Sequence, residues 1–298
     1  MDESIRVKRF SELSPGEQNS LLKHVINGIH SSNSLDLLSL NNMVRSIFND
    51  GQSYFTVWRE VVPIGCIGCL VKDVSTKGIA YLAGISFSSE DRECFSEVLK
   101  TATEYVARFN PSKLKLGITP HYSFLTSLII DSGFEVCDRA LVLKHDKTCF
   151  RFNRKMQINL APVSHANRRY FLDLYNNCFI DTPNATVLSL EELDRALKSS
   201  NTSIYGFAKF QQDDIGVFEL ARSSSTGSIE AMAIAPDFRN QGYGEQLLHS
   251  ILNHLYKNCA QVKLVVMETN TAAKKLYESN GFLETGVKSI WFEARPIF

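Results

Sequence analysis

The chain has 298 residues, of which 44% are hydrophobic and 21% charged, and its 32 basic and 32 acidic residues cancel. This composition is typical of a folded globular protein of about two domains. A zero net charge gives no reason to expect a nucleic-acid or membrane partner.

The N-terminal residues Met1-Asp-Glu-Ser4 lack the basic start and apolar core of a signal peptide. The longest apolar run, residues 61–71, contains a proline and two glycines and is shorter than the ~18 residues that suggest a membrane span. We expect a buried strand and a turn there. The seven cysteines are an odd number spread along the chain, which indicates reduced thiols and a cytoplasmic protein.

Cys66 and Cys69 in this run form an isolated CxxC pair. A zinc site would need a second pair or nearby histidines. A redox site would need a helix start that lowers the pKa of one thiol. We therefore expect two small side chains in a strand, and we predict no metal site in this chain.

The second half has a regular succession of apolar patterns. Period-two alternation predicts strands at residues 157–160, 203–210, 215–221, 228–235 and 262–267, and helical spacing predicts helices at 164–178, 189–198, 242–257 and 272–279. Ser189 and Glu192 form a capping box. The order is β-α-α-β-β-β-α-β-α-β. Only 16 residues follow Phe282, fewer than two closing strands need, so a missing strand comes from the first half or is absent.

The two halves resemble each other when the sequence is shifted by 148 residues. Ser132-Gly-Phe134 then falls on Asn280-Gly-Phe282, and the helical pattern of residues 94–110 falls on residues 242–258. We interpret this as two copies of one α/β unit, at residues 1–150 and 151–298.

The most informative segment runs from Met232 to Leu248. A short apolar strand leads to Pro236 and to Arg239-Asn-Gln-Gly-Tyr-Gly244, and a helix follows. Glycines there let backbone N–H groups gather at a helix N-terminus, where unpaired donors and the helix dipole favour a phosphate. The spacing differs from the P-loop and from Gly-x-Gly-x-x-Gly.

This series resembles the pyrophosphate loop of the GNAT superfamily of acetyl-CoA-dependent N-acetyltransferases. Asn270-x-x-Ala273-x-x-x-Tyr277, followed by Gly281-Phe282, resembles its second signature. The predicted element order is also that of the superfamily. The resemblance implies an α/β fold (an α+β mixed sheet) with two tandem GNAT-like domains, each a twisted, mostly antiparallel sheet flanked by helices.

The first copy lacks the residues that carry this resemblance. Cys94-Phe-Ser96 falls opposite Gly242-Tyr-Gly244, and Ile129 falls opposite Tyr277. We therefore predict a degenerate first domain and a single acetyl-CoA site in the second.

The resemblance implies how the co-substrate acetyl-CoA is held. The N–H groups of residues 239–244 face the pyrophosphate, and the arginine charge also suits phosphate. Backbone groups of the splayed strand near residues 232–234 pair with the pantetheine arm, and one N–H there could stabilise the oxyanion. The predicted acetyl-CoA-binding residues are Met232, Ala233, Ile234, Arg239, Asn240, Gln241, Gly242, Tyr243, Gly244, Asn270 and Ala273.

Acetyl transfer to an amine needs a base for the ammonium and an acid for the departing thiolate. The resemblance assigns the acid to Tyr277, and a phenol pKa of ~10 suits a thiolate of pKa ~8.5. Glu230 is the predicted base, and alternation places it on one face with Met232 and Ile234. Glu219 on the preceding strand is a second candidate. Alternatively, Tyr277 only packs in the core, and Glu230 is a solvated residue at a partly exposed strand end.

We therefore expect an acyltransferase that moves an acetyl group from acetyl-CoA to a primary amine by direct attack. The acceptor is a small molecule or a peptide, and acidic Asp181, Glu219 and Glu230 favour a cationic one. A non-catalytic acetyl-CoA sensor or scaffold is the alternative. The sequence also leaves open a homodimer.

Overall fold

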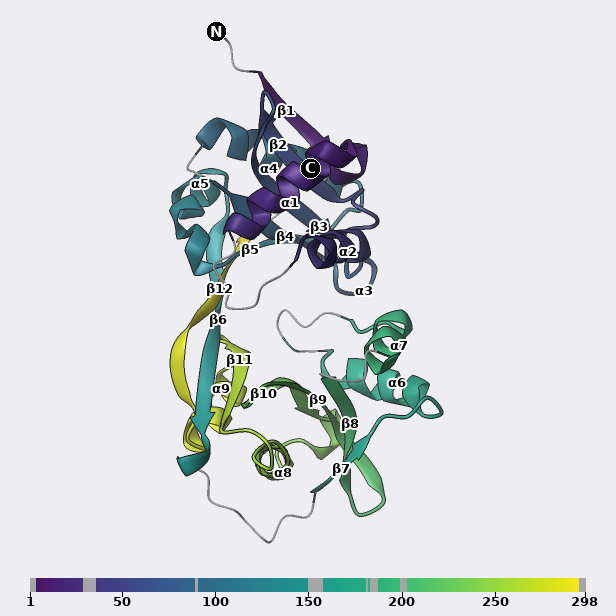
Figure 1. Ribbon diagram of the computed structural model, residues 1–298. Coiled ribbons are helices and arrows are strands. Elements are labelled where there is room, and N and C mark those ends of the chain that lie inside the picture. Colours follow the sequence, from purple (N-terminus) through teal and green to yellow (C-terminus); the bar gives the residue numbers. More distant parts are fainter. Residues whose placement is uncertain are drawn as a thin grey trace. The chain divides into compact units, whose positions relative to one another are not determined.

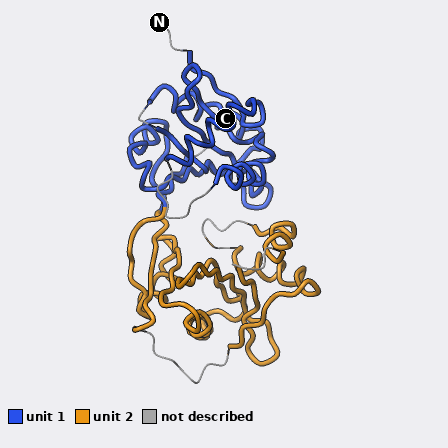
Figure 2. The backbone as a smooth tube through the Cα atoms, viewed as in Figure 1, with its two compact units in different colours: residues 1–138, 289–298 blue, residues 139–288 orange. Residues whose placement is uncertain are grey.

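The computed structural model describes residues 4–28, 36–88, 91–149, 158–180, 182, 187–198 and 203–294. The chain forms two compact units, which we call unit 1 (Met1–Asp138 with Ser289–Phe298) and unit 2 (Arg139–Lys288). Figure 1 shows that both units contain strands and helices, and Figure 2 marks the two units in different colours. Within the described part of the chain, no helix is long and apolar enough to cross a membrane.

Unit 1 begins with a strand and two helices and then alternates strands with helices. Its elements are β1 (Ile5–Arg9), α1 (Pro15–Gly28), α2 (Leu37–Ile47), β2 (Tyr54–Arg59), β3 (Val62–Leu70), α3 (Val74–Lys77), β4 (Ile79–Phe87), α4 (Arg92–Ala107), β5 (Lys113–Ile118) and α5 (Thr126–Asp131). The hydrogen-bonding order of its strands is β1-β2-β3-β4-β5, followed by β12 (Leu283–Ala294).

Unit 2 repeats this succession. Its elements are β7 (Ile158–Pro162), α6 (Arg168–Cys178), α7 (Leu190–Lys198), β8 (Ser203–Phe210), β9 (Asp213–Ser223), β10 (Thr226–Ile234), α8 (Tyr243–Leu255), β11 (Gln261–Met267) and α9 (Thr271–Ser279). The predicted order of strands and helices is confirmed, and most of the predicted bounds differ by only a few residues. The capping box also forms, because the Ser189 N–H donates to Glu192 at 2.8 Å and the Glu192 N–H donates to the Ser189 hydroxyl at 3.2 Å.

The strand that closes the sheet of unit 2 comes from the first half of the sequence. β6 (Glu135–Asp146) pairs antiparallel with β11, from Asp146 opposite Gln261 to Ala140 opposite Met267. β12 in turn pairs with β5 of unit 1 through residues 290–294. The unit boundaries therefore differ from the predicted domains 1–150 and 151–298, since residues 139–150 lie in unit 2 and residues 289–298 in unit 1.

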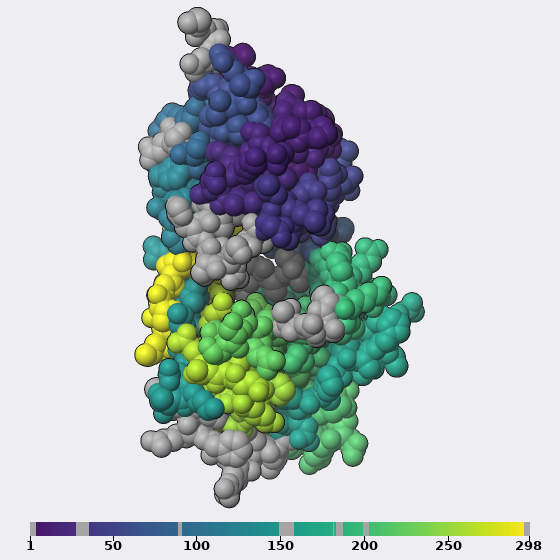
Figure 3. Space-filling model, viewed as in Figure 1, coloured from purple at the N-terminus to yellow at the C-terminus, as the bar shows by residue number. Residues whose placement is uncertain are grey.

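Helices cover both faces of the sheet in unit 2. On one face, α8 and α9 pack on a core that contains Phe218 and, partly buried, Met232. On the other face, α6 and α7 pack on a core that contains Val217 and, partly buried, Ala233. The space-filling view shows α7 at the surface of the unit (Figure 3), in agreement with Leu193 being its one buried residue. Each residue of β10 can therefore be assigned to the α8 face or the α6 face.

The CxxC cysteines lie in strand β3, as predicted. Cys66 and Cys69 are buried free thiols, and burial raises the pKa of Cys66 to about 12. Among the residues described, no group of three or more His, Cys, Asp and Glu side chains could hold a metal ion.

Candidate functional site

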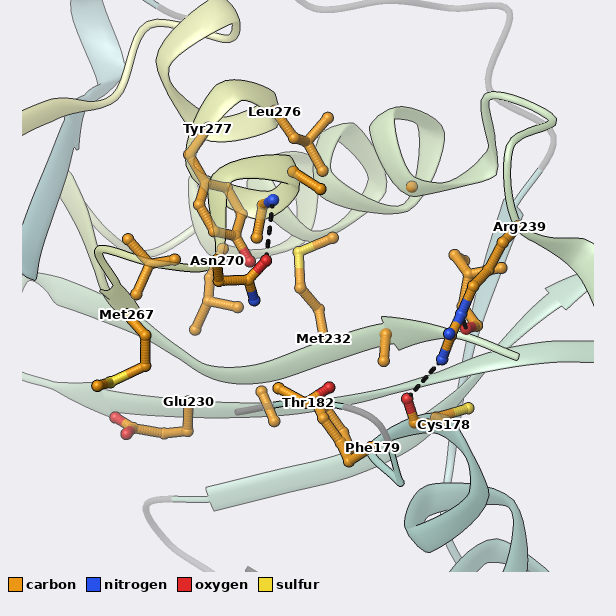
Figure 4. A pocket seen from close by; sticks show the side chains of 18 of the residues that line it. Cys178, Phe179, Thr182, Glu230, Met232, Arg239, Met267, Asn270, Leu276 and Tyr277 are labelled. Atoms are coloured by element: carbon orange, nitrogen blue, oxygen red, sulfur yellow. Dashed lines mark hydrogen bonds between the residues drawn. The ribbon is translucent and has the colours of Figure 1, made fainter. Parts of the chain in front are cut away.

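A cavity of about 720 Å³ lies in unit 2. Tyr175 and Phe179 line it from the α6 face of the sheet, and Leu276 and Tyr277 line it from α9 on the other face (Figure 4). Because both helical layers contribute to one cavity, the cavity extends through the sheet between β10 and β11.

The gap between these two strands arises from their pairing. They are parallel, and their pairing is limited to residues 226–229 of β10, which lie opposite residues 261–264 of β11. Beyond that point the cavity is lined by residues 230–234 on one side and 265–267 on the other. β10 therefore presents backbone groups to the cavity instead of to a neighbouring strand.

The direction of these backbone groups follows from alternation along β10. The Ala235 N–H donates to the Ile215 carbonyl of β9 at 2.9 Å, so the backbone of Ala233 also faces β9. The backbone groups of Met232 and Ile234 face the gap. The sequence analysis assigned the pantetheine contact to Ala233 as well, but only Met232 and Ile234 have suitably directed groups.

The N-terminus of α8 meets the same cavity. Gly242 is its N-cap residue with φ +80°, a left-handed conformation that suits glycine, and it offers no side chain to the first N–H groups of the helix. Gly244 lines the cavity, and a Cβ added there would meet only Leu276, at 3.6 Å. This end of the helix thus leaves both donors and space for an anionic group.

Arg239 has a different role from the predicted phosphate contact. Its Nε donates to the Ile234 carbonyl at 3.0 Å, and its Nη2 donates to the Cys178 carbonyl at the end of α6 at 2.8 Å (Figure 4). The guanidinium therefore ties β10 to α6. This contact also occupies the one backbone carbonyl of Ile234 that would otherwise face the gap.

The other predicted residues of the turn are divided between the cavity and its surroundings. Asn240 lines the cavity, whereas Gln241, Gly242 and Tyr243 are not part of its lining. The Gln241 side chain donates to the Asp237 carbonyl at 3.3 Å. Tyr243 packs its ring against Phe210 with centroids 5.0 Å apart, so its side chain belongs to the core.

Tyr277 and Asn270 both line the cavity from α9. Tyr277 is 8% exposed, and burial raises its pKa to about 12. Its hydroxyl therefore stays protonated at neutral pH, as a proton donor requires. Asn270 caps α9 by accepting the Ala273 N–H at 3.3 Å. Figure 4 shows the Tyr277 ring extending from α9 toward Asn270.

The predicted position of Glu230 is wrong in one respect. A β-bulge between Ile229 and Ala231 adds a residue to β10, which breaks the alternation that would place Glu230 beside Met232 and Ile234. Glu230 is exposed, accepts a hydrogen bond from Ser228, and extends away from Tyr277 (Figure 4). It still lines the cavity.

Glu219, the second candidate, lies in a more enclosed place. The Tyr205 hydroxyl donates to its Oε1 at 2.6 Å, and the Tyr175 hydroxyl donates to its Oε2 at 3.5 Å. Burial and the charge of Glu230 raise the pKa of Glu219, although the tyrosine hydrogen bonds lower it. Asp181, the third acidic candidate, lies outside the described residues.

The sequence analysis missed the contribution of α6 to the cavity. Tyr175, Cys178 and Phe179 line it from the end of this helix. Their apolar spacing predicted a core face, and nothing in the spacing separates core positions from cavity positions.

Comparison with known proteins agrees with this geometry. Residues 154–282 match the model of the Acetyltransferase (GNAT) family. Over 84 residues the chain is 30% identical to a [ribosomal protein bS18]-alanine N-acetyltransferase of Haemophilus ducreyi. That match covers 28% of this chain and 58% of the relative.

Solved structures extend the likeness to the whole chain at the level of the fold. A GCN5-related N-acetyltransferase from Sphaerobacter thermophilus superposes with a TM-score of 0.70 at 11% identity, over 99% of this chain and 96% of the other. A tandem GNAT protein from the clavulanic acid biosynthesis pathway superposes with a TM-score of 0.64 at 9% identity, over 98% and 99% of the two chains.

Proposed function

Because residues 154–282 match the model of the Acetyltransferase (GNAT) family, we propose that this protein transfers an acetyl group from acetyl-CoA to a primary amine. The observation that carries the proposal is the gap between β10 and β11, which meets the N-terminus of α8 in one cavity. A long, thin ligand with a phosphate at one end fits such a cavity, and the α6 face leaves room for a second molecule.

The residues present fit acetyl-CoA in two places. The N–H groups at the start of α8, with Gly244 beside them, would hold the pyrophosphate. The backbone groups of Met232 and the N–H of Ile234, whose carbonyl already accepts from Arg239, would pair with the pantetheine arm as an added strand. Acetyl-CoA supplies the activated acetyl group as a thioester.

Tyr277 is our proposed general acid. It lines the cavity next to the gap, and its phenol is protonated at neutral pH and so can donate to the departing thiolate. Burial raises its pKa and thereby makes it a weaker acid than an exposed phenol. The Met232 N–H is the proposed donor to the acetyl oxygen when negative charge develops there.

We propose a cationic primary amine as the acceptor, in a small molecule or at the N-terminus of a peptide. Glu230 lines the cavity, and Glu219 accepts a hydrogen bond from Tyr175, which lines the cavity together with Phe179. The 30% identical relative is a [ribosomal protein bS18]-alanine N-acetyltransferase, so a peptide that begins with alanine is the first acceptor to test.

Calorimetry and a CoA-release assay test this function together. We expect acetyl-CoA to bind and to be consumed with at least one amine among an alanine-initiated peptide, spermidine and 2-phenylethylamine. Acetyl-CoA binding without transfer to any of them would favour the sensor alternative. No binding at all would contradict both functions.

A further inference from the structure

Glu219 is the centre of a polar cluster on the α6 face of unit 2. Tyr205, Glu219 and Ala231 lie opposite one another on β8, β9 and β10, in one cross-strand row. Side chains in such a row point to the same face of the sheet. Tyr175 approaches the same carboxylate from α6.

This cluster borders the cavity. Ala231 and Tyr175 both line it. Glu219 is not itself a lining residue, but it lies opposite Ala231 and accepts a hydrogen bond from Tyr175. Phe179 lines it too, and its ring packs on that of Tyr175 with centroids 4.8 Å apart. A carboxylate with aromatic rings around it is a site that favours a cation.

We propose that Glu219 binds the ammonium group of the acceptor and takes the proton that its nitrogen must lose before attack. The proposal rests on the proposed function and names the base and the substrate class of that site. The acceptor is then a primary ammonium with an apolar or aromatic neighbouring group, because Tyr175, Phe179 and Ala231 form the nearby wall.

The geometry favours Glu219 over Glu230. Two tyrosine hydroxyls hold the carboxylate of Glu219 in one orientation and use two of its acceptor sites, so other sites remain for an ammonium group. Burial and the charge of Glu219 raise the pKa of Tyr175, so this hydroxyl remains a donor. Glu230 is exposed and is held only by Ser228 among the contacts observed.

The reaction balances in protons and electrons. One ammonium proton passes to Glu219, and the nitrogen lone pair then bonds to the acetyl carbon. A second proton leaves the nitrogen for solvent, and the third stays on the amide. The electrons of the C–S bond go to sulfur, which takes the proton of Tyr277. Glu219 gives its proton to solvent, and Tyr277 regains one, so each turnover releases one proton.

Glu219→Gln tests the proposal through its pH dependence. The amide keeps an acceptor for Tyr205 but cannot take a proton. The probe is an alanine-initiated peptide, whose α-amino group has a pKa near ~8, or 2-phenylethylamine if the peptide is not acetylated. At a pH well below the amine pKa we expect kcat/KM to fall by ~10²–10⁴-fold relative to wild type. One unit above the amine pKa, where the amine is mostly neutral, the deficit should shrink to a few-fold.

A deficit that stays constant across this pH range would overturn the proposal, because it would indicate a structural role. Melting temperatures of both proteins check that the variant is folded. Glu97→Gln, an exposed position on α4 of unit 1, is the matched control and should leave the profile unchanged.

Two further variants should move the acid limb of the wild-type profile in opposite directions. The titratable groups that face Glu219 are Tyr205 on β8, Tyr175 on α6 and Glu230 on β10. Tyr205→Phe removes a hydrogen bond that lowers the pKa of Glu219, so the limb should move to higher pH. Glu230→Gln removes a charge that raises this pKa, so the limb should move to lower pH. If the acid limb is unchanged in both variants, the assignment of Glu219 as the base is contradicted.

A separate result distinguishes failure of the proposed function. If the wild type acetylates none of the amines, the transferase proposal fails. The ammonium site can then still be tested by calorimetry of 2-phenylethylamine binding to the CoA-bound protein. Binding that Glu219→Gln weakens by at least about tenfold would still support an ammonium site. Binding that is absent or insensitive to this change would overturn it.

Discussion

Helices α4 of unit 1 and α8 of unit 2 align in the 148-residue repeat but differ at their N-termini. In α4, Asp91 accepts the Cys94 N–H at 3.0 Å and pairs with Arg59 at 2.9 Å. In α8, the cap residue is Gly242, which has no side chain to offer. A carboxylate thus caps the first N–H groups of α4, whereas no side chain of the cap residue reaches those of α8.

The strands beside these helices differ in the same way. In unit 1, Tyr122 is 4% exposed and donates its hydroxyl to Ser86 at 3.0 Å. The offset of 148 aligns Tyr122 with Asn270 and Ser86 with Ile234, since 270 − 148 = 122 and 234 − 148 = 86. Phe87 and Phe95 pack together nearby with centroids 5.3 Å apart. Aromatic side chains therefore fill in unit 1 the region that is a cavity in unit 2.

The two units share a backbone arrangement but differ in the side chains that would allow acetyl-CoA to bind. Both units keep the parallel pair of strands whose pairing stops after four residues, β4 with β5 and β10 with β11. A few side chains at the start of the helix and between the two strands determine whether the space between the strands is filled by the protein or can hold acetyl-CoA.

The largest effect should come from Tyr277→Phe. The change removes only the phenol oxygen, so the ring contact with Phe282 at 5.7 Å remains. We expect kcat to fall by ~10²–10⁴-fold, with acetyl-CoA affinity nearly unchanged, as measured by steady-state kinetics and calorimetry. Turnover within a few-fold of wild type would show that Tyr277 only packs.

Gly244→Glu should weaken acetyl-CoA binding by more than about 100-fold, or by about 2.7 kcal/mol. The new side chain would take the place of the pyrophosphate and repel it. Ser96→Glu is the matched control, because Ser96 is the exposed counterpart of Gly244 at the start of α4. It should leave the affinity unchanged. Equal effects of the two changes would contradict the difference between the helix starts.

Asp91→Ala should affect stability and not binding. Loss of this cap should lower the free energy of unfolding by about 1 kcal/mol in denaturant titrations. Burial opposes ionisation of Asp91, but hydrogen bonds from Cys94 and Arg59 outweigh it, so its pKa is lowered. The deficit should therefore be present at neutral pH and shrink as the pH falls through this lowered value. A gain of a second acetyl-CoA site in this variant would contradict the filled-gap account.

The smallest effect concerns the melting temperature of Glu219→Gln. The pKa of Glu219 is raised in the folded protein, so the ionised carboxylate destabilises the fold at pH values above the ordinary 4.5. The variant should melt higher than wild type at pH 7, by no more than about 4 °C, and this gain should disappear near pH 4. A lower melting temperature at both pH values would mean that the carboxylate is needed for the fold.

The sequence predicted the element order of unit 2 and the residues that follow local rules. The glycine turn at Gly242 and the capping box of Ser189 and Glu192 both form, and both are set by nearby residues in the chain. These features could be inferred because glycine turns and caps have local signatures.

Features that depend on register or distant partners could not be predicted. The bulge at Glu230 is set by how β10 meets β9, and an alternation count along β10 alone does not reveal it. Arg239 binds carbonyls of β10 and α6, the second of which is 61 residues away. The sequence predicted only that the closing strand comes from the first half or is absent, and the structure shows that β6 supplies it.

Titration of the full chain with acetyl-CoA tests the central claim most directly. Isothermal calorimetry should give one equivalent per chain for the wild type and for Ser96→Glu, and no measurable binding for Gly244→Glu. Two equivalents, or one equivalent that survives Gly244→Glu, would contradict the account, because acetyl-CoA would then bind outside the gap beside α8.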